Sequence, residues 1–130
     1  MAFLLDTNVL IHLRDGDATI ASRVASLDGA ILMSIVSRVE LEGGVYREPS
    51  QAGLRRPRLD AILPALPVLA FDDAAADAYR RIVEAAGYSR RKMLDRMIAA
   101  QALVHRATLV TLNRSDFADI PGLPLLAWRE

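Results

Sequence analysis

The stretch that decides the fold is Phe3-Leu4-Leu5-Asp6-Thr7-Asn8-Val9-Leu10-Ile11, close to the start of the chain. Its first three residues form an apolar run that suits a buried strand and is too short for a helix. An acid, a hydroxyl and an amide follow, and then further apolar residues that begin a helix. We therefore predict a strand that passes through a polar turn into a helix. Asp6 would lie at the carboxyl end of this strand, where parallel α/β sheets bind their ligands.

Strand-like and helix-like segments alternate along the rest of the chain. Short apolar runs predict further strands at residues 30–35, 67–71 and 107–112 and a short edge strand at 123–128. Helices are predicted at 8–13, 17–27, 72–86 and 92–106, together with one after the second strand and an irregular one that is interrupted near Pro57 and ends near residue 63. This order is typical of an α/β fold with a mostly parallel sheet of about five strands that helices cover on both faces.

Length and composition restrict the class of protein. With 130 residues, the chain is expected to form a single domain over residues 1–130. Sixteen basic and sixteen acidic residues leave no net charge, so only a local patch could bind a nucleic acid. Cysteine is absent, which excludes disulfides and thiolate metal sites. Neither an export signal nor a membrane-spanning run is present, so we expect a soluble, cytoplasmic protein with no membrane contact.

Four acidic residues lie where predicted strands end or predicted helices begin: Asp6, Glu40, Asp95 and Asp116. One edge of a single parallel sheet would gather all four, so we predict that they line a common pocket. Each also has a purely structural explanation. Asp6 could cap the first helix, Ser37 and Glu40 fit a capping box, Arg91 could pair with Asp95, and Asp116 could close an Asx turn.

Carboxylates gathered in this way repel one another. At an effective dielectric constant near 20, two of them about 5 Å apart cost roughly 3 kcal/mol, so the group would take up protons or bind a cation. An oxygen-lined pocket without cysteine suits Mg²⁺ or Mn²⁺ better than zinc. The two histidines, His12 and His105, lie on predicted helices away from the acid-bearing turns, so we expect neither to be a ligand.

Basic residues gather in two places. Arg90, Arg91 and Lys92 stand at the start of the helix that carries Asp95, where the helix dipole disfavours positive charge. This placement suggests a phosphate partner, although a solvated charge run explains it equally well. The same two interpretations apply to the second group, which consists of Arg55, Arg56 and Arg58.

The chain resembles the PIN-domain nucleases and, within them, the VapC-type toxins of toxin–antitoxin pairs. The resemblance spans nearly the whole chain and rests on four blocks: Leu5-Asp6-Thr7-Asn8, Ser37 with Glu40-Leu41, residues 94–100, and residues 109–113 leading to Asp116-Phe117. It departs from many relatives at Leu112, where they carry a basic residue, and at residues 88–91, where they carry a Gly-Arg pair. These departures leave the metal set intact and concern the choice of substrate.

The resemblance implies a three-layer α/β/α fold and a metal-dependent endoribonuclease that hydrolyses RNA with water as the nucleophile. The metal-binding acids of the family fall on Asp6, Glu40, Asp95 and Asp116, and its polar support falls on Asn8, Ser37, Thr111 and Asn113. We expect Asp6 and Asp95 to contact Mg²⁺ or Mn²⁺ directly, with Glu40 and Asp116 completing the shell. The resemblance also implies a VapB-type antitoxin partner and a homodimer.

Other interpretations remain open from the residues themselves. Glu42 competes with Glu40, and because two residues on a helix point about 200° around it, at most one of the pair faces the metal. A phosphoacceptor domain also gathers acids around Mg²⁺, although it would normally place a lysine after a late strand, where this chain has Leu112-Asn113-Arg114. A binding module that keeps the PIN fold without catalysis is the third possibility.

Overall fold

A five-stranded parallel sheet lies at the centre of the protein. The computed structural model describes residues 1–128, and its strands run in the order β3-β2-β1-β4-β5. The first strand, β1 (Ala2–Leu5), lies in the middle, between β2 (Ala30–Ser34) and β4 (Thr108–Thr111). The edges are β3 (Val68–Leu69) and β5 (Leu125–Ala127), and all four pairings are parallel. The predicted α/β class is therefore confirmed.

The register of the three central strands brings their carboxyl ends to one level. Leu5 lies opposite Met33 on β2 and opposite Val110 on β4. The next residue on each of these three strands is Asp6, Ser34 or Thr111, and all three are buried. The strand ends thus bring together polar groups from positions that are far apart in the sequence.

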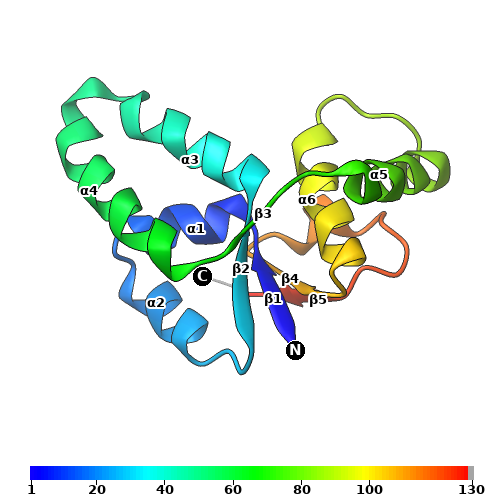
Figure 1. Cartoon of the computed structure of the whole chain (residues 1–130), viewed down its shortest axis with the longest axis horizontal. Helices are drawn as coiled ribbons and strands as arrows, with labels where there is room; N and C mark the ends of the chain where they lie inside the picture. Colours follow the sequence, from blue (N-terminus) through cyan, green and yellow to red (C-terminus); the bar gives the residue numbers. More distant parts are fainter. Residues whose placement is uncertain (129–130) are drawn as a thin grey trace.

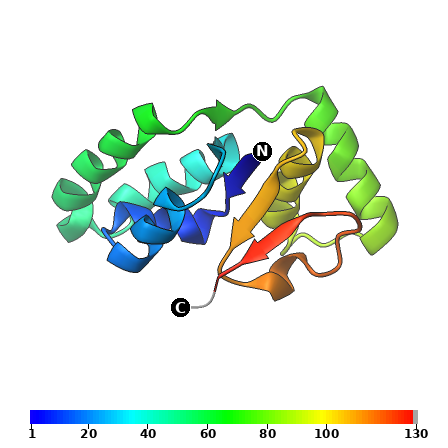
Figure 2. The same ribbon diagram turned by 90° about the horizontal axis from the view of Figure 1, so that it is seen from below.

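Helices cover the sheet on both faces. On one side lie α1 (Thr7–Arg14), α2 (Ala18–Ala25), α3 (Ile35–Tyr46) and α4 (Ala52–Ile62); on the other lie α5 (Asp73–Ala86) and α6 (Met93–Val104) (Figure 1). The view from below shows the same two groups with the strands between them (Figure 2). Three short 3-10 segments, η1 (Pro49–Gln51), η2 (Leu63–Ala65) and η3 (Arg114–Phe117), complete the fold.

The alternation of side chains along β1 explains the two hydrophobic cores. Phe3 and Leu5 point to the core that packs under α1 to α4, whereas Leu4 points to the core under α5 and α6. Successive side chains of a strand face opposite sides of the sheet, so one short apolar run serves both cores. This arrangement is the three-layer α/β/α architecture that the resemblance implied.

A buried polar contact fixes α6 against the sheet. Ser34 donates from its hydroxyl to Oε1 of Gln101, and Nε2 of Gln101 donates to the Leu69 carbonyl at 3.0 Å. Ser34 and Gln101 are both fully buried, so these bonds supply the partners that buried polar groups require. They join β2, β3 and α6 at the same end of the sheet as Asp6.

Two local predictions are wrong. The helix after β2 begins at Ile35, with Ser34 as its N-cap, so Ser37 is an interior residue and not the start of a capping box. The helix that contains Pro57 continues without interruption from Ala52 to Ile62. Proline removes one backbone bond there, but Leu59 is fully buried and Arg56 pairs with Asp60 across the proline, and these contacts hold the helix together. No helix within residues 1–128 is both long and apolar enough to span a membrane.

Candidate metal centre

All four predicted acids line one groove at the carboxyl end of the sheet. The groove has a volume of about 460 Å³. Asp6 follows β1, Glu40 lies in the middle of α3, Asp95 in the first turn of α6, and Asp116 in η3. Four elements that are far apart in the chain thus contribute one carboxylate each to the same cavity.

Asp6 serves as a helix cap and as a groove residue at the same time. Its Oδ1 accepts a hydrogen bond from the Thr7 backbone N–H at 2.8 Å, and its Oδ2 accepts one from the Thr111 hydroxyl at 3.0 Å. The Asn113 backbone N–H in turn donates to the Thr111 hydroxyl at 3.0 Å. The carboxylate is therefore held from β1, α1 and the end of β4, which gives it a defined position at the floor of the groove.

Thr7 is a site residue that the sequence did not single out for its side chain. Its hydroxyl donates to Oε1 of Glu40 at 2.9 Å and lies 2.8 Å from the Ser37 hydroxyl. Glu40 is thereby tied to α1, and Ser37 supports the contact from within α3. The only signal in the sequence is the hydroxyl next to Asp6, because nothing in a linear pattern relates residue 7 to residues 37 and 40.

The carboxylates of Asp95 and Asp116 line the groove without a hydrogen-bond or ion-pair partner within residues 1–128. The suggested pair between Arg91 and Asp95 is absent from this part of the chain, and the Asx turn belongs to Asn113, whose side chain accepts from the Ser115 backbone at 3.3 Å. Of the implied polar supports, Asn8 lines the groove, whereas the Asn113 side chain is engaged with Ser115. Asp95 and Asp116 therefore offer all their carboxylate lone pairs to a ligand, whereas each oxygen of Asp6 already accepts one hydrogen bond and keeps one lone pair.

The acids raise one another's proton affinity. Burial is the main cause that raises the pKa of Asp6 from 3.8 to about 6, with smaller contributions from the charges of Asp95 and Asp116 and an opposing effect of the Thr111 hydrogen bond. Burial also raises the pKa of Asp95 to about 6, followed by the charges of Asp116 and Glu40. The groove thus concentrates negative charge, and a bound cation would relieve the repulsion.

The donor set fits a hard, hydrated cation. The four predicted acids offer oxygen, while His12 contacts Asp17 at 3.4 Å and His105 caps the end of α6, so neither histidine competes for a metal. Among residues 1–128, no group of three or more acidic or histidine side chains is placed so that it could hold a metal ion. Mg²⁺ does not need three protein ligands, because it usually keeps several waters and binds one or two carboxylates.

The competing acid and three of the six basic residues in the predicted groups are engaged elsewhere. Glu42 does not line the groove and pairs with Arg56 at 2.6 Å, and this hydrogen bond holds the pKa of Glu42 below its usual value. Lys92 pairs with Asp119 at 3.1 Å. Arg55 lines the groove, whereas Arg58 donates to the Asp15 carbonyl at 3.0 Å. The structure therefore places Glu40, and not Glu42, with the other three acids.

Comparison with known proteins agrees with this fold. The model of the PIN domain family matches residues 3–123, so the chain belongs to the PIN-domain family. Membership of this family supports a nuclease role. Comparison with curated proteins gives no match.

The solved structures that the chain resembles include complexes of the VapBC family of toxin–antitoxin systems. VapBC2 from Rickettsia felis, bound to a DNA fragment from its promoter, is 26% identical with a TM-score of 0.84, over 98% of this chain and 99% of that chain. VapBC-1 from nontypeable Haemophilus influenzae is 25% identical with a TM-score of 0.78, over 98% of each chain. FitAcB from Neisseria gonorrhoeae is 26% identical with a TM-score of 0.78, over 95% of this chain and 96% of that chain.

Proposed function

We propose that this protein is a metal-dependent endoribonuclease that hydrolyses RNA phosphodiester bonds, and that it acts as the VapC-type toxin of a toxin–antitoxin pair. The observation that carries the proposal is the convergence of Asp6, Glu40, Asp95 and Asp116 on one groove in a PIN-domain chain. The similarity to the VapBC structures supports the toxin assignment.

In this proposal, the protein contributes positioned oxygen ligands. Asp6 and Asp95 would hold Mg²⁺ or Mn²⁺ directly, and Glu40 and Asp116 would bind its waters. Such an ion, when bound, polarises a phosphodiester and lowers the pKa of a coordinated water. The hydrogen bonds of Thr111 to Asp6 and of Thr7 to Glu40 orient two of these carboxylates before substrate arrives.

The test is cleavage of single-stranded RNA by the purified protein with Mg²⁺ or Mn²⁺, with a chelator, and with substituted proteins. We expect the chelator, Asp6→Asn and Asp95→Asn each to remove cleavage. Asp28→Asn is the matched control, because Asp28 is exposed and lies outside the groove, and it should cut like the parent. Cleavage that survives chelation or Asp95→Asn would contradict the proposed centre.

The phosphoacceptor interpretation has less support than the nuclease. Both oxygens of Asp6 accept hydrogen bonds, and Asp6 is only 4% exposed, so a phosphodonor would have to displace these contacts. A non-catalytic PIN module would be the conclusion if the parent protein failed to cut RNA in either metal.

The proposal includes two partners. A VapB-type antitoxin would cover the acidic groove with a basic side chain, which the charge of the groove and the VapBC neighbours support. A second copy of the chain would cover an apolar hollow of about 330 Å³ beside Glu40, which is lined by Ile35, Val36, Val39, Phe71, Leu94 and Met97. Val39 is 65% exposed and Leu94 43% exposed, so this hollow leaves apolar surface in contact with water.

A further inference from the structure

The groove that holds the four acids has a second, basic end. Arg14, Arg47 and Arg55 line it there, together with Asp15, Gly44 and Glu48. These residues come from the end of α1, the end of α3 and the start of α4. One continuous cavity thus passes from an anionic end to an end where three arginines face two carboxylates.

Arg14 is buried and only partly satisfied. Its side chain is 4% exposed, and its Nε and Nη2 both contact Oδ1 of Asp15, at 3.1 and 3.0 Å. Nη1 of Arg14 makes no hydrogen bond with any residue in the described range 1–128. A Cβ atom added to Gly44 would lie only 3.3 Å from this nitrogen. The glycine leaves space beside this nitrogen, so one donor of a buried guanidinium remains available to a ligand in the groove.

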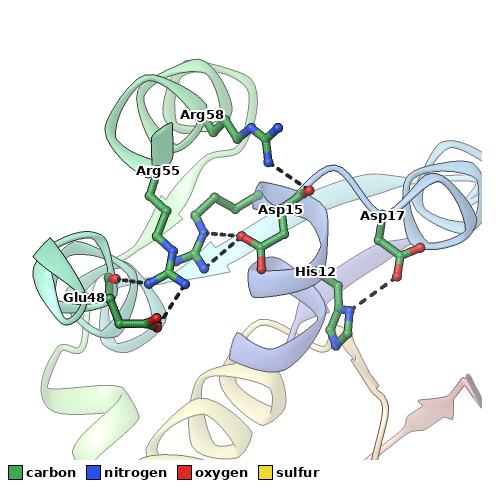
Figure 3. A network of polar contacts seen from close by, with 8 residues as sticks. His12, Asp15, Asp17, Glu48, Arg55 and Arg58 are labelled. Carbon is green, nitrogen blue, oxygen red and sulfur yellow. Dashed lines mark hydrogen bonds and ion pairs between the residues drawn. The ribbon is translucent and has the colours of Figure 1, made fainter. Parts of the chain in front are cut away.

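Arg55 and Arg47 add further donors around the same glycine. Arg55 donates to the Gly44 carbonyl at 3.0 Å and pairs with Glu48 at 3.2 Å, and its side chain is only 18% exposed. Figure 3 shows Arg55 reaching from α4 towards Glu48, with Arg58 directed to Asp15 nearby. Arg47 lines the groove, is exposed, and has no polar partner within residues 1–128.

This arrangement favours an anion with several oxygens. Guanidinium groups held close together repel unless a negative group lies between them, and their planar donors match phosphate oxygens. Asp15 and Glu48 neutralise this end incompletely, since within residues 1–128 Arg47 and the Nη1 donor of Arg14 remain without a carboxylate. A nucleic-acid strand carries its phosphates at regular intervals, so a strand with one phosphate at the acids has a neighbouring phosphate further along the groove.

We propose that Arg14, Arg47 and Arg55 form a phosphate subsite that binds the RNA backbone beside the phosphodiester addressed by the four acids. The proposal deepens the nuclease assignment and rests on it. The subsite fixes the position of the strand along the groove, so the acids act on one bond and not on its neighbours.

The test measures binding of a short, fluorescently labelled single-stranded RNA by anisotropy at increasing salt, in the non-cleaving Asp95→Asn background with Mg²⁺ present. Adding Arg47→Gln and Arg55→Gln together is expected to weaken binding about tenfold or more. The slope of log affinity against log salt should become shallower by about 0.7 for each phosphate that the protein no longer binds. In the active background, the same pair should raise KM and leave kcat nearly unchanged.

Arg58→Gln is the matched control. Arg58 lies on the same helix as Arg55, also donates to a backbone carbonyl, and does not line the groove. It should bind RNA with the affinity and salt slope of the Asp95→Asn background alone. Arg47 and Arg55 carry the test because truncation of the buried Arg14 could prevent folding.

Two outcomes overturn the subsite: unchanged RNA affinity in the Arg47→Gln, Arg55→Gln protein, or an equal loss with Arg58→Gln. A third is that the pair weakens binding of a protein inhibitor and leaves RNA affinity intact, because the basic end would then serve a protein partner. If the parent binds RNA in an arginine-dependent way but never cuts it, the subsite stands and the nuclease proposal fails.

Discussion

At the level of single residues, Asp6 and Asp95 are carboxylates placed where ionisation is unfavourable. The pKa of each is raised to about 6, mainly by burial, and both face other acids in the groove. An acid with a raised pKa destabilises the folded protein when it is ionised. The protein is therefore less stable at neutral pH than it would be without these ionised groups, and a cation in the groove would offset this cost.

The pH dependence of stability tests this view. The pKa of Asp95 is about 6 in the folded protein and 3.8 in the unfolded chain. Between these two pH values the folded protein binds more protons than the unfolded chain, so its stability falls as the pH rises from 3.8 to about 6. We compare the unfolding free energy of Asp95→Asn with that of the parent, with a chelator present. The difference should shift in favour of the variant by about 1 kcal/mol when the pH is raised from about 5 to about 7.5. This figure is reduced because Asp95 is partly exposed. Urea denaturation at both pH values measures it. Identical pH profiles for the parent and the variant would contradict the raised pKa.

Thr7 provides the second test at this scale. Thr7→Val removes the hydroxyl that contacts Ser37 and Glu40, leaving a buried hydroxyl on Ser37 without its partner. We expect a loss of about 1 to 2 kcal/mol in stability and a similar weakening of catalysis, about tenfold in cleavage rate. Thr7→Ser keeps the hydroxyl and should retain most of both. Single-turnover RNA cleavage and urea denaturation would separate these outcomes, and equal activity of the two variants would exclude the orienting role.

Among the elements, α6 carries residues for two purposes on successive positions. Asp95 enters the groove, while Arg96 is 2% exposed, with its guanidinium bonded to the Gly87 carbonyl and to Asp119. Nε of Arg96 is buried and has no partner within residues 1–128. Asp119 follows η3, which carries Asp116, so the ion pair holds η3 against α6 and brings the two groove acids together.

Removal of this pair should therefore affect stability and activity together. Asp119→Ala leaves the buried Arg96 charge without its carboxylate, and we expect a loss of about 1 to 2 kcal/mol, limited by the partial exposure of Asp119. Cleavage should weaken as well, because Asp116 is less firmly placed. Thermal unfolding and RNA cleavage measure the two effects. Asp77→Ala, at an exposed position of α5, is the control, and a comparable loss in that protein would refute the role given to the ion pair.

At the scale of the whole molecule, charge and apolar surface are both unevenly distributed despite a net charge of zero. All three arginines of the groove lie at one of its ends, and the apolar hollow next to Glu40 exposes Val39 and Leu94. An exposed apolar patch of this kind is typical of an interface. The groove and the hollow share Glu40, so a second copy bound at the hollow would lie at the rim of the proposed active site.

The oligomeric state in solution tests the proposed dimer. Light scattering coupled to size exclusion should give the mass of a dimer for the parent and of a monomer for Val39→Asp with Leu94→Asp, because charges are costly to bury at an interface. Leu54→Asp is the control, since Leu54 is 50% exposed on α4 and lies outside the hollow. A monomeric parent, or a dimer that survives both substitutions, would contradict the use of this hollow.

The sequence by itself determined the alternation of strands and helices, the α/β class and the positions of the four acids, because these follow from local periodicity. Phe3, Leu4 and Leu5 could be assigned to a buried strand from their neighbours alone. Asp6 directly follows this run in the sequence, so it had to lie at the carboxyl end of the strand. The rule that parallel strands end at a common edge then predicted that the other acids would lie near it.

Only the tertiary structure decided the contacts between distant residues. Packing between separate elements decides the start of α3 at Ile35, the uninterrupted helix through Pro57, the bond of Thr7 to Glu40 and the place of the arginines around Gly44. The physical reason is that strand register and helix packing fix which side chains meet, and these arise from the whole core and not from any short stretch of sequence.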